Sequence, residues 1–176
     1  MDGIFHMTEV DGTTLYQINN KFGTTADDLA ITSNTLRATA SWLFPARLYV
    51  NNQGADQYSS FIRKAGAFSS GLVILYLQST TNENGYRIQI SSDRFTLYKL
   101  DSWTAQGLFT HDWTADTKIS AKIVSGSLSV YIDDVQVGSV FVDSTPITGG
   151  YPGFTIYLGG SSSDSHCISE WTDNSF

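Results

Sequence analysis

The sequence has little cysteine and little charge. Cys167 is the one cysteine in 176 residues, so an intrachain disulfide is excluded. Charged side chains make up 15% of the residues, against a typical share of about 25%. Acidic residues outnumber basic ones, 17 to 10, and the formal net charge is −7. Because a phosphate-binding surface needs a basic stripe, this balance argues against a nucleic-acid partner.

Long hydrophobic runs are also missing. No apolar stretch approaches the roughly 20 residues of a membrane helix, so membrane insertion is not expected. The first seven residues have neither the basic nor the apolar region of a signal peptide. Two accounts stay open: a trimmed mature domain, or a protein made in a cytosol and released in another way. The many Ser, Thr, Gly and Tyr residues favour an extracellular location, and the missing signal peptide favours a virion-associated one, because phage proteins are made in the cytosol and need no export.

The best helix candidate in the sequence is a single turn over 24–29. What the sequence does contain is strand periodicity. The stretch GSLSVYIDDVQVGS (126–139) shows the pattern most clearly. Leu128, Val130 and Ile132 fall on one side of a period-2 strand. Asp133 and Asp134 then favour a tight reversal, because Asp tolerates the left-handed backbone conformation. This stretch predicts a β-hairpin with one buried face.

Similar segments follow one another at the spacing of roughly 8–12 residues that is typical of β-sandwiches. No repeat or long linker divides the chain, so residues 1–176 are predicted to form one all-β domain. The stretch from Cys167 to Phe176 is expected to pair near the N-terminus. The predicted strands are Leu29–Thr32, Thr35–Ala40, Trp42–Asn51, Tyr58–Arg63, Leu72–Gln78, Tyr86–Ile90, Phe95–Leu100, Ile119–Val124, Leu128–Ile132, Val135–Val142 and Phe154–Leu158.

The order of the segments resembles a known family. The segments are DGTTL (11–15), ITSNTLRA (31–38), SGLVILYLQSTTNENGYRIQISSDRFTLYKL (70–100), KISAKIVSGSLSVYIDDVQVGSVFVDST (118–145) and TGGYPGFTIYLGG (148–160). Together they resemble the concanavalin A-like, laminin G-like jelly rolls that accompany glycan-active enzymes, adhesins and phage tail or head proteins. The resemblance implies an antiparallel two-sheet jelly-roll sandwich, with glycans bound on the concave sheet or on loops at one edge.

The same family includes enzymes, so catalytic residues need to be considered. A retaining glycosidase needs two carboxyl groups about 5–5.5 Å apart. The related glucanases carry them in a Glu-x-Asp-x-Glu pattern, whereas Glu9, Glu83 and Glu170 are far apart in this sequence. The His and Tyr motif of the lyases is also missing, and no nucleophile elbow surrounds SDSH (163–166). We therefore expect no enzymatic activity.

Strand parity gives a first set of carbohydrate-binding candidates. If Ile88 and Ile90 face the core, Arg87 and Gln89 face outward, and the same alternation turns Tyr98 and Tyr131 outward. Rigid aromatic rings can stack on sugar faces, and planar polar groups can bond to sugar hydroxyls. The four outward residues are therefore predicted to form one polar-aromatic sheet face. The alternative is that they are ordinary solvated or inter-sheet residues.

Loop aromatics give a second set. Trp103 and Trp113 bracket TAQGLFTHD, which is interpreted as a loop, and Tyr151 lies in TGGYPG. Exposed tryptophans at these positions would favour contact with a ligand. The alternative for each tryptophan is that it fills a sheet edge.

Calcium is a possible structural cofactor by the same resemblance, because in this family the ion often ties the N-terminal loop to the C-terminal strand. Asp11 and Asp173 are the acidic pair that fits, and calcium needs six to eight oxygen ligands. No EF-hand type of loop is present.

The leading functional prediction is non-catalytic binding of a polysaccharide or cell-surface glycan. The alternative is a structural virion or appendage protein, a phage decoration or an adhesin, that forms a homo-oligomer and contacts host glycans.

Overall fold

A computed structural model describes residues 3–6, 29–32, 35–38, 55–63, 71–79, 85–91, 93–100, 103–112, 116–158 and 168–174. In this part of the chain every regular element is a β-strand, and no helix is long and apolar enough to span a membrane. The strands are β1 (Gly3–His6), β2 (Leu29–Thr32), β3 (Thr35–Ala38), β4 (Gln57–Arg63), β5 (Gly71–Ser79), β6 (Tyr86–Ile90), β7 (Arg94–Lys99), β8 (Trp103–Leu108), β9 (Thr117–Val124), β10 (Ser127–Ile132), β11 (Val135–Val142), β12 (Tyr151–Leu158) and β13 (Ile168–Asn174).

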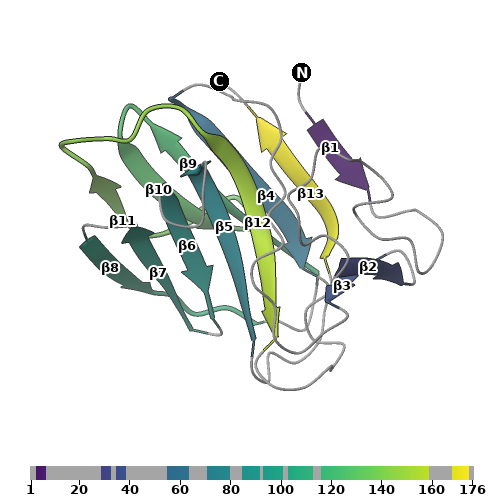
Figure 1. Cartoon of the computed structure of the whole chain (residues 1–176). Helices are drawn as coiled ribbons and strands as arrows, with labels where there is room; N and C mark the ends of the chain where they lie inside the picture. Colours follow the sequence, from purple (N-terminus) through teal and green to yellow (C-terminus); the bar gives the residue numbers. More distant parts are fainter. Residues whose placement is uncertain are drawn as a thin grey trace.

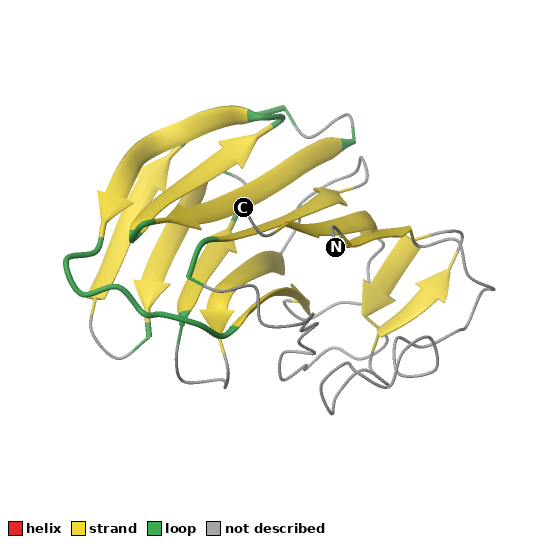
Figure 2. Cartoon of the chain, turned by 90° about the horizontal axis from the view of Figure 1, so that it is seen from above, coloured by secondary structure: helices red, strands yellow, loops and turns green. Residues whose placement is uncertain are grey.

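These strands form two antiparallel sheets that pack face to face (Figures 1 and 2). The large sheet has the order β11-β10-β9-β4-β13-β3-β2, with β1 also paired to β13. The small sheet has the order β12-β5-β6-β7-β8. The all-β two-sheet prediction is confirmed, and so is the return of the C-terminal stretch to the N-terminal strand. The expected strand at 42–51 lies outside the described residues, and so does the expected turn at 24–29 except for Leu29, which begins β2.

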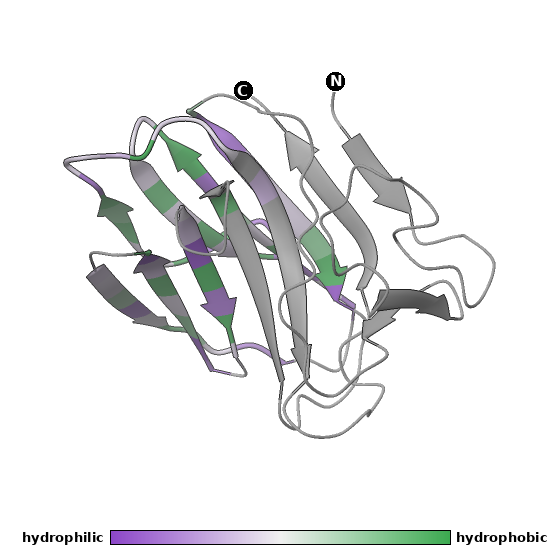
Figure 3. Cartoon of the chain, viewed as in Figure 1, coloured by the Kyte–Doolittle hydropathy of each residue, from purple (hydrophilic) through white to green (hydrophobic). Residues whose placement is uncertain are grey.

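The core lies between the sheets, where alternate side chains point inward. Ile88 and Leu97 of the small sheet are fully buried, as are Ile119 and Ile123 of the large sheet. The alternation between green and purple along β6 and β9 in Figure 3 follows this period of two. Burying one such aliphatic side chain contributes about 1.5–3 kcal/mol, so the shared core holds the two layers together.

The hairpin between β10 and β11 forms as its sequence predicts. Asp133 and Asp134 both have positive φ angles, 47° and 64°. This is the left-handed geometry of a two-residue hairpin turn whose twist matches that of the strands. The Asp133 carboxylate accepts a hydrogen bond from the Lys118 amide at 2.9 Å, which ties the turn to β9.

The end strands β8 of the small sheet and β11 of the large sheet lie at the same edge of the sandwich, which we call the open edge (Figure 1). Trp103 begins β8, and its ring stacks on Phe141 of β11 with 6.5 Å between centroids. The register of β11 against β10 shifts near its middle, and Gly138 there has a φ of 69°. The expected loop after Trp103 is therefore wrong over 103–108, because this segment pairs with β7 as a strand.

Candidate functional site

Three polar side chains meet on the outer face of the small sheet. Arg87 and Gln89 lie two residues apart on β6, so their side chains share a face, and Tyr98 is the β7 partner of Arg87. The Arg87 Nη2 group donates a hydrogen bond to Gln89 Oε1 at 3.1 Å. The Arg87 guanidinium carbon lies 5.3 Å from the centre of the Tyr98 ring, a cation–π contact. The sequence placed all three residues on one outward face, and the structure confirms this part of the prediction.

The cluster belongs to two rows of polar side chains that cross β6, β7 and β8. We call them the polar rows. They are Arg87–Tyr98–Thr104 and Gln89–Thr96–Gln106. Neither row contains an acidic residue, and neither do β6, β7 and β8 as a whole. The result is a surface of hydroxyl, amide and guanidinium groups without negative charge.

Sequence reasoning missed the three further members of the polar rows, Thr96, Thr104 and Gln106. Thr104 and Gln106 were assigned to a loop, although they alternate with Trp103 and Ala105 as a strand would. Thr104 and Gln106 are exposed, whereas Thr96 is buried between its neighbours. The sequence signal for β8 was the alternation of Trp103 and Ala105 with the polar Thr104 and Gln106, weakened by Gly107, a residue that is rare in strands.

Tyr131 does not join the cluster, and this corrects the predicted four-residue face. It lies on β10 in the large sheet, where the Lys122 ammonium group is 5.0 Å from the centre of its ring. Strand parity gave its outward direction correctly, because its neighbours Val130 and Ile132 are buried. Parity assigns a side chain to the inside or the outside of the sandwich, but it does not say which of the two outer faces the residue reaches.

Trp103 packs at the open edge and not on the outer face. Its ring lies 6.4 Å from Tyr86 and stacks on Phe141, which fits the edge-filling alternative. Trp113 lies outside the described residues. Tyr151 opens β12 opposite Ser79, and its side chain is not among those described.

The structure does not describe the side chains of the two predicted calcium ligands. Asp11 lies outside the described residues. Asp173 lies in β13, where its backbone pairs with Gly3 and Ser59, and its side chain is not described. Within the described part of the chain, no group of three His, Cys, Asp or Glu side chains is placed to hold a metal. Calcium stays a prediction, which melting curves with and without a chelator test.

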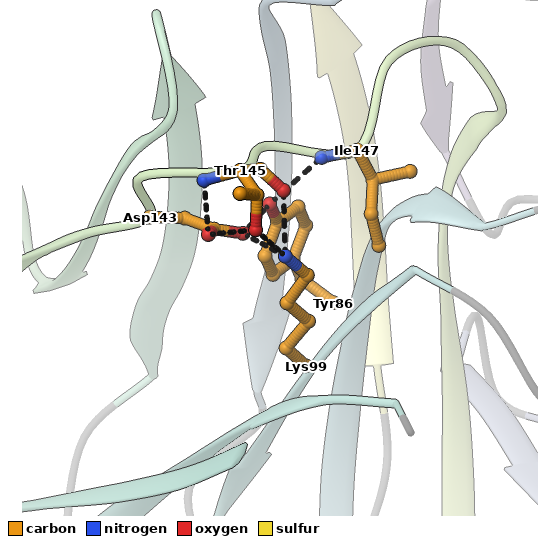
Figure 4. Close-up of polar contacts among 5 residues, drawn as sticks. All are labelled: Tyr86, Lys99, Asp143, Thr145 and Ile147. Atoms are coloured by element: carbon orange, nitrogen blue, oxygen red, sulfur yellow. Dashed lines mark hydrogen bonds and ion pairs between the residues drawn. The ribbon is translucent and has the colours of Figure 1, made fainter. Parts of the chain in front are cut away.

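Figure 4 shows a polar network that includes Tyr86 and Lys99. These two residues pair across β6 and β7 one position away from Arg87 and Tyr98, so the network lies on the inner side of the same two strands. The Lys99 ammonium group lies 2.7 Å from Asp143 Oδ2 and donates to the Thr145 carbonyl at 2.6 Å. The Tyr86 hydroxyl donates to the same Asp143 oxygen at 2.5 Å and accepts from the Ile147 amide at 3.1 Å. The network thus fixes the connection from β11 to β12 onto β6 and β7.

The network shifts the pKa values of its two acidic groups in opposite directions. Burial raises the pKa of Tyr86 to about 12, helped by its hydrogen bond to Asp143. Burial alone would raise the pKa of Asp143, but hydrogen bonds from Lys99, Tyr86 and the Thr145 amide lower it to about 2. Asp143 is therefore ionised and Tyr86 neutral at physiological pH, a fully satisfied arrangement.

Because Tyr86 and Lys99 precede and follow the cluster residues Arg87 and Tyr98, the network and the cluster share a backbone. The inner network holds the two strands in register, and the outer side chains are oriented by that register. Sequence reasoning missed the network, since nothing in the local pattern links Asp143 to Lys99 and Tyr86 across the chain.

No protein-family model matches the chain, and no curated protein matches its sequence. Solved structures do match its shape. The exoplasmic/lumenal domain of VIP36 in its Ca²⁺/Man-bound form is 15% identical, with a TM-score of 0.60, covering 85% of this chain and 81% of that one. The galectin LEC-6 of Caenorhabditis elegans is 10% identical, with a TM-score of 0.53, covering 76% and 93%. These likenesses confirm the concanavalin A-like jelly-roll fold.

Proposed function

We propose that the chain binds carbohydrate, without cleaving it, on the outer face of the small sheet. The observation that carries this proposal is the cluster of Arg87, Gln89 and Tyr98, joined by a hydrogen bond and a cation–π contact. The cluster lies on regular strands whose inner side is locked by buried groups, so its geometry is set before a ligand arrives. A binding site gains affinity from such preorganisation, because less side-chain entropy is lost on binding.

The chemistry of the polar rows suits a sugar. A sugar ring presents hydroxyl groups at its edge and C–H groups on its faces. The amides of Gln89 and Gln106 both donate and accept hydrogen bonds, as hydroxyl groups do. Tyr98 provides a rigid ring with an apolar body and a polar tip. The shared fold with VIP36, whose structure is described in a Man-bound form, also supports a glycan ligand.

The absence of acids from this surface supports binding without cleavage. Glycoside hydrolysis by the usual route needs a pair of carboxyl groups flanking the scissile bond. Strands β6, β7 and β8 contribute none, and the carboxylate of Asp143 on their inner side is engaged by Lys99 and Tyr86. A ligand on the polar rows would meet donors and acceptors but no acid and base pair.

A glycan array followed by calorimetric titration of the strongest hit tests the proposal. We expect Tyr98→Ala to weaken binding about tenfold or more, because it removes both the ring and the support of Arg87. Tyr131→Ala is the matched control, since it makes the same change on the other sheet and should leave affinity unchanged. Melting curves of both variants show whether the fold is kept. Equal affinities for the wild type and Tyr98→Ala would remove the site from the small sheet.

A second candidate function is assembly into an oligomer, as in a virion or appendage protein. Exposed apolar side chains at the open edge favour it: Val135 is 67% exposed, Val142 76% and Leu108 73%. An edge strand without charged or proline residues is a template for pairing with a second copy. Light scattering of the wild type and Val142→Lys tests this, and a monomeric wild type at high concentration contradicts it.

A further inference from the structure

The basic side chains of the described part of the chain differ in what neutralises them. Three of them lie beside an aspartate. The pairs are Arg94 with Asp93 at 3.1 Å, Lys99 with Asp143 at 2.7 Å and Lys118 with Asp134 at 2.8 Å. Arg87 and Lys122 are different: each lies over a tyrosine ring, and no carboxylate of the described residues lies within ion-pair distance of either. Of the two, Arg87 carries the planar guanidinium, which can bind a carboxylate through two hydrogen bonds. In a chain with a net charge of −7, a half-buried guanidinium that finds no counter-charge in the described part of the chain is unusual.

We propose that the polar rows recognise a sugar that carries a carboxylate, a uronic or sialic acid, and that Arg87 is the group that binds this carboxylate. This inference rests on the proposed function and adds the chemical class of the ligand.

The local geometry holds the guanidinium ready for an anion. Gln89 accepts a hydrogen bond from Nη2, and the Tyr98 ring lies against the guanidinium plane. Nε is buried and has no hydrogen-bond partner among the described residues. Nη1 makes no hydrogen bond to the described residues either, so Nη1 and the second proton of Nη2 are left to donate. Two such donors match the two oxygens of a carboxylate, the strongest pairing that arginine makes.

The surroundings favour an anionic sugar over a neutral one. No acidic residue on β6, β7 or β8 repels a carboxylate. The half-buried position of Arg87 lowers the local dielectric and strengthens a charge-assisted hydrogen bond. The negative charge of the whole chain opposes a polyanion at long range, but at 0.15 M salt the screening length is about 8 Å. Recognition is therefore a short-range property of the cluster.

The test is affinity electrophoresis at 0.15 M salt with the whole chain. The gels contain polygalacturonate, hyaluronan or polysialic acid, and a parallel gel contains methyl-esterified polygalacturonate, which keeps the sugar backbone and loses the charge. We expect at least one acidic polymer to retard the wild type, and polygalacturonate to do so more strongly than its ester if it is the one bound. Arg87→Gln should weaken binding of the acidic polymer about ten- to a hundredfold, the value of a hydrogen bond between charged groups.

Arg94→Gln is the matched control, because it removes the same charge from β7 at an exposed position next to Asp93. Its affinity for the acidic polymer should stay within about twofold of the wild type, since its charge is screened. Arg87→Lys serves if Arg87→Gln does not fold, and we expect it to lose affinity as well because an ammonium group lacks the planar fork.

The outcomes separate this inference from the proposed function. Retardation by neutral polymers that Tyr98→Ala abolishes, with no preference for acidic ones, keeps the proposed function and overturns the role of Arg87. Equal losses in Arg87→Gln and Arg94→Gln overturn it too, since they indicate general charge attraction. Stronger retardation by dextran sulfate than by every carboxylated polymer reassigns the site to sulfated sugars. No retardation by any carboxylated polymer overturns the inference outright.

Discussion

At the scale of single residues, Phe95 shows how closely the two sheets approach at the open edge. A methyl group built onto Gly107 of β8 would lie 2.2 Å from Phe95 Cζ, and one built onto Gly138 of β11 would lie 2.7 Å from the same atom. Phe95 is fully buried, so its ring has no room to yield. Two glycines, one from each sheet, therefore let both edge strands close over one aromatic ring.

Alanine at either glycine should destabilise the fold. Gly107→Ala adds only a clash and should lower the free energy of unfolding by about 2–3 kcal/mol. Gly138→Ala adds the cost of a positive φ to a similar clash, so we expect it to lower that free energy by roughly 1 kcal/mol more. Urea denaturation of the two variants, alone and combined with Phe95→Leu, measures these values. Leucine at position 95 is smaller than phenylalanine and should restore most of the stability lost in Gly107→Ala. Additive free-energy losses in the double variant would contradict the packing argument.

The pKa values of Asp143 and Tyr86 predict how the stability of the fold depends on pH. The pKa of Asp143 is about 2 in the folded chain, below its ordinary value of 3.8, so the ionised form stabilises the fold above about pH 4. That contribution is lost as the pH falls from about 4 to 2. The pKa of Tyr86 is about 12, above its ordinary value of 10.0, so its contribution is complete below about pH 10 and is lost between 10 and 12. Melting temperatures should form a plateau between these limits.

Asp143→Asn should reduce the fall in melting temperature between about pH 4 and pH 2, the acid limb of the pH profile. It should also lower the free energy of unfolding at pH 7 by about 2–3 kcal/mol, because Lys99 keeps a nearly buried charge without its partner. Asp134→Asn is the control: its carboxylate is 70% exposed, and its bridge to Lys118 contributes less than about 1 kcal/mol. Parallel acid limbs in the wild type and Asp143→Asn would show that other carboxylates set the profile.

At the scale of elements, the two aspartates in the turn between β10 and β11 have different roles. Both have positive φ, which costs a non-glycine residue about 1 kcal/mol. Asp134 makes only an exposed ion pair, so Asp134→Gly should raise the free energy of unfolding by about 0.5 kcal/mol. Asp133 accepts the Lys118 amide hydrogen bond, whose loss cancels the gain in Asp133→Gly. Thermal denaturation of the two variants checks this order, and equal shifts would contradict it.

The strands also show how much of the secondary structure the local sequence can predict. The strand from Tyr86 to Ile90 was predicted with its exact bounds, because alternating Ile88 and Ile90 give a clean period of two. The strand from Trp103 to Leu108 was missed, since Gly107 and Gln106 resemble loop residues. Gly107 is there because Phe95, twelve positions earlier, leaves no space for a side chain. Such a requirement comes from tertiary packing and leaves no local signal.

At the scale of the whole molecule, the sequence predicted the sandwich but not the partition of residues between its two outer faces. The alternation that directs Arg87, Tyr98 and Tyr131 outward is a property of one strand. The assignment of Tyr131 to the large sheet depends on the chain crossing between sheets after β8. The predicted sheet face therefore contained three residues that do share one outer face, together with one from the opposite face.

The arrangement of the two sheets also predicts how the chain unfolds. Each sheet supplies one wall of a shared core, so neither layer keeps its buried surface without the other. Urea should therefore unfold the single predicted domain in one transition, seen at the same midpoint by far-ultraviolet circular dichroism and by the fluorescence of its 4 tryptophans. Gly138→Ala, which acts at the edge, should shift both probes together. Two separated midpoints would show that the layers are independent and would contradict the single-domain prediction.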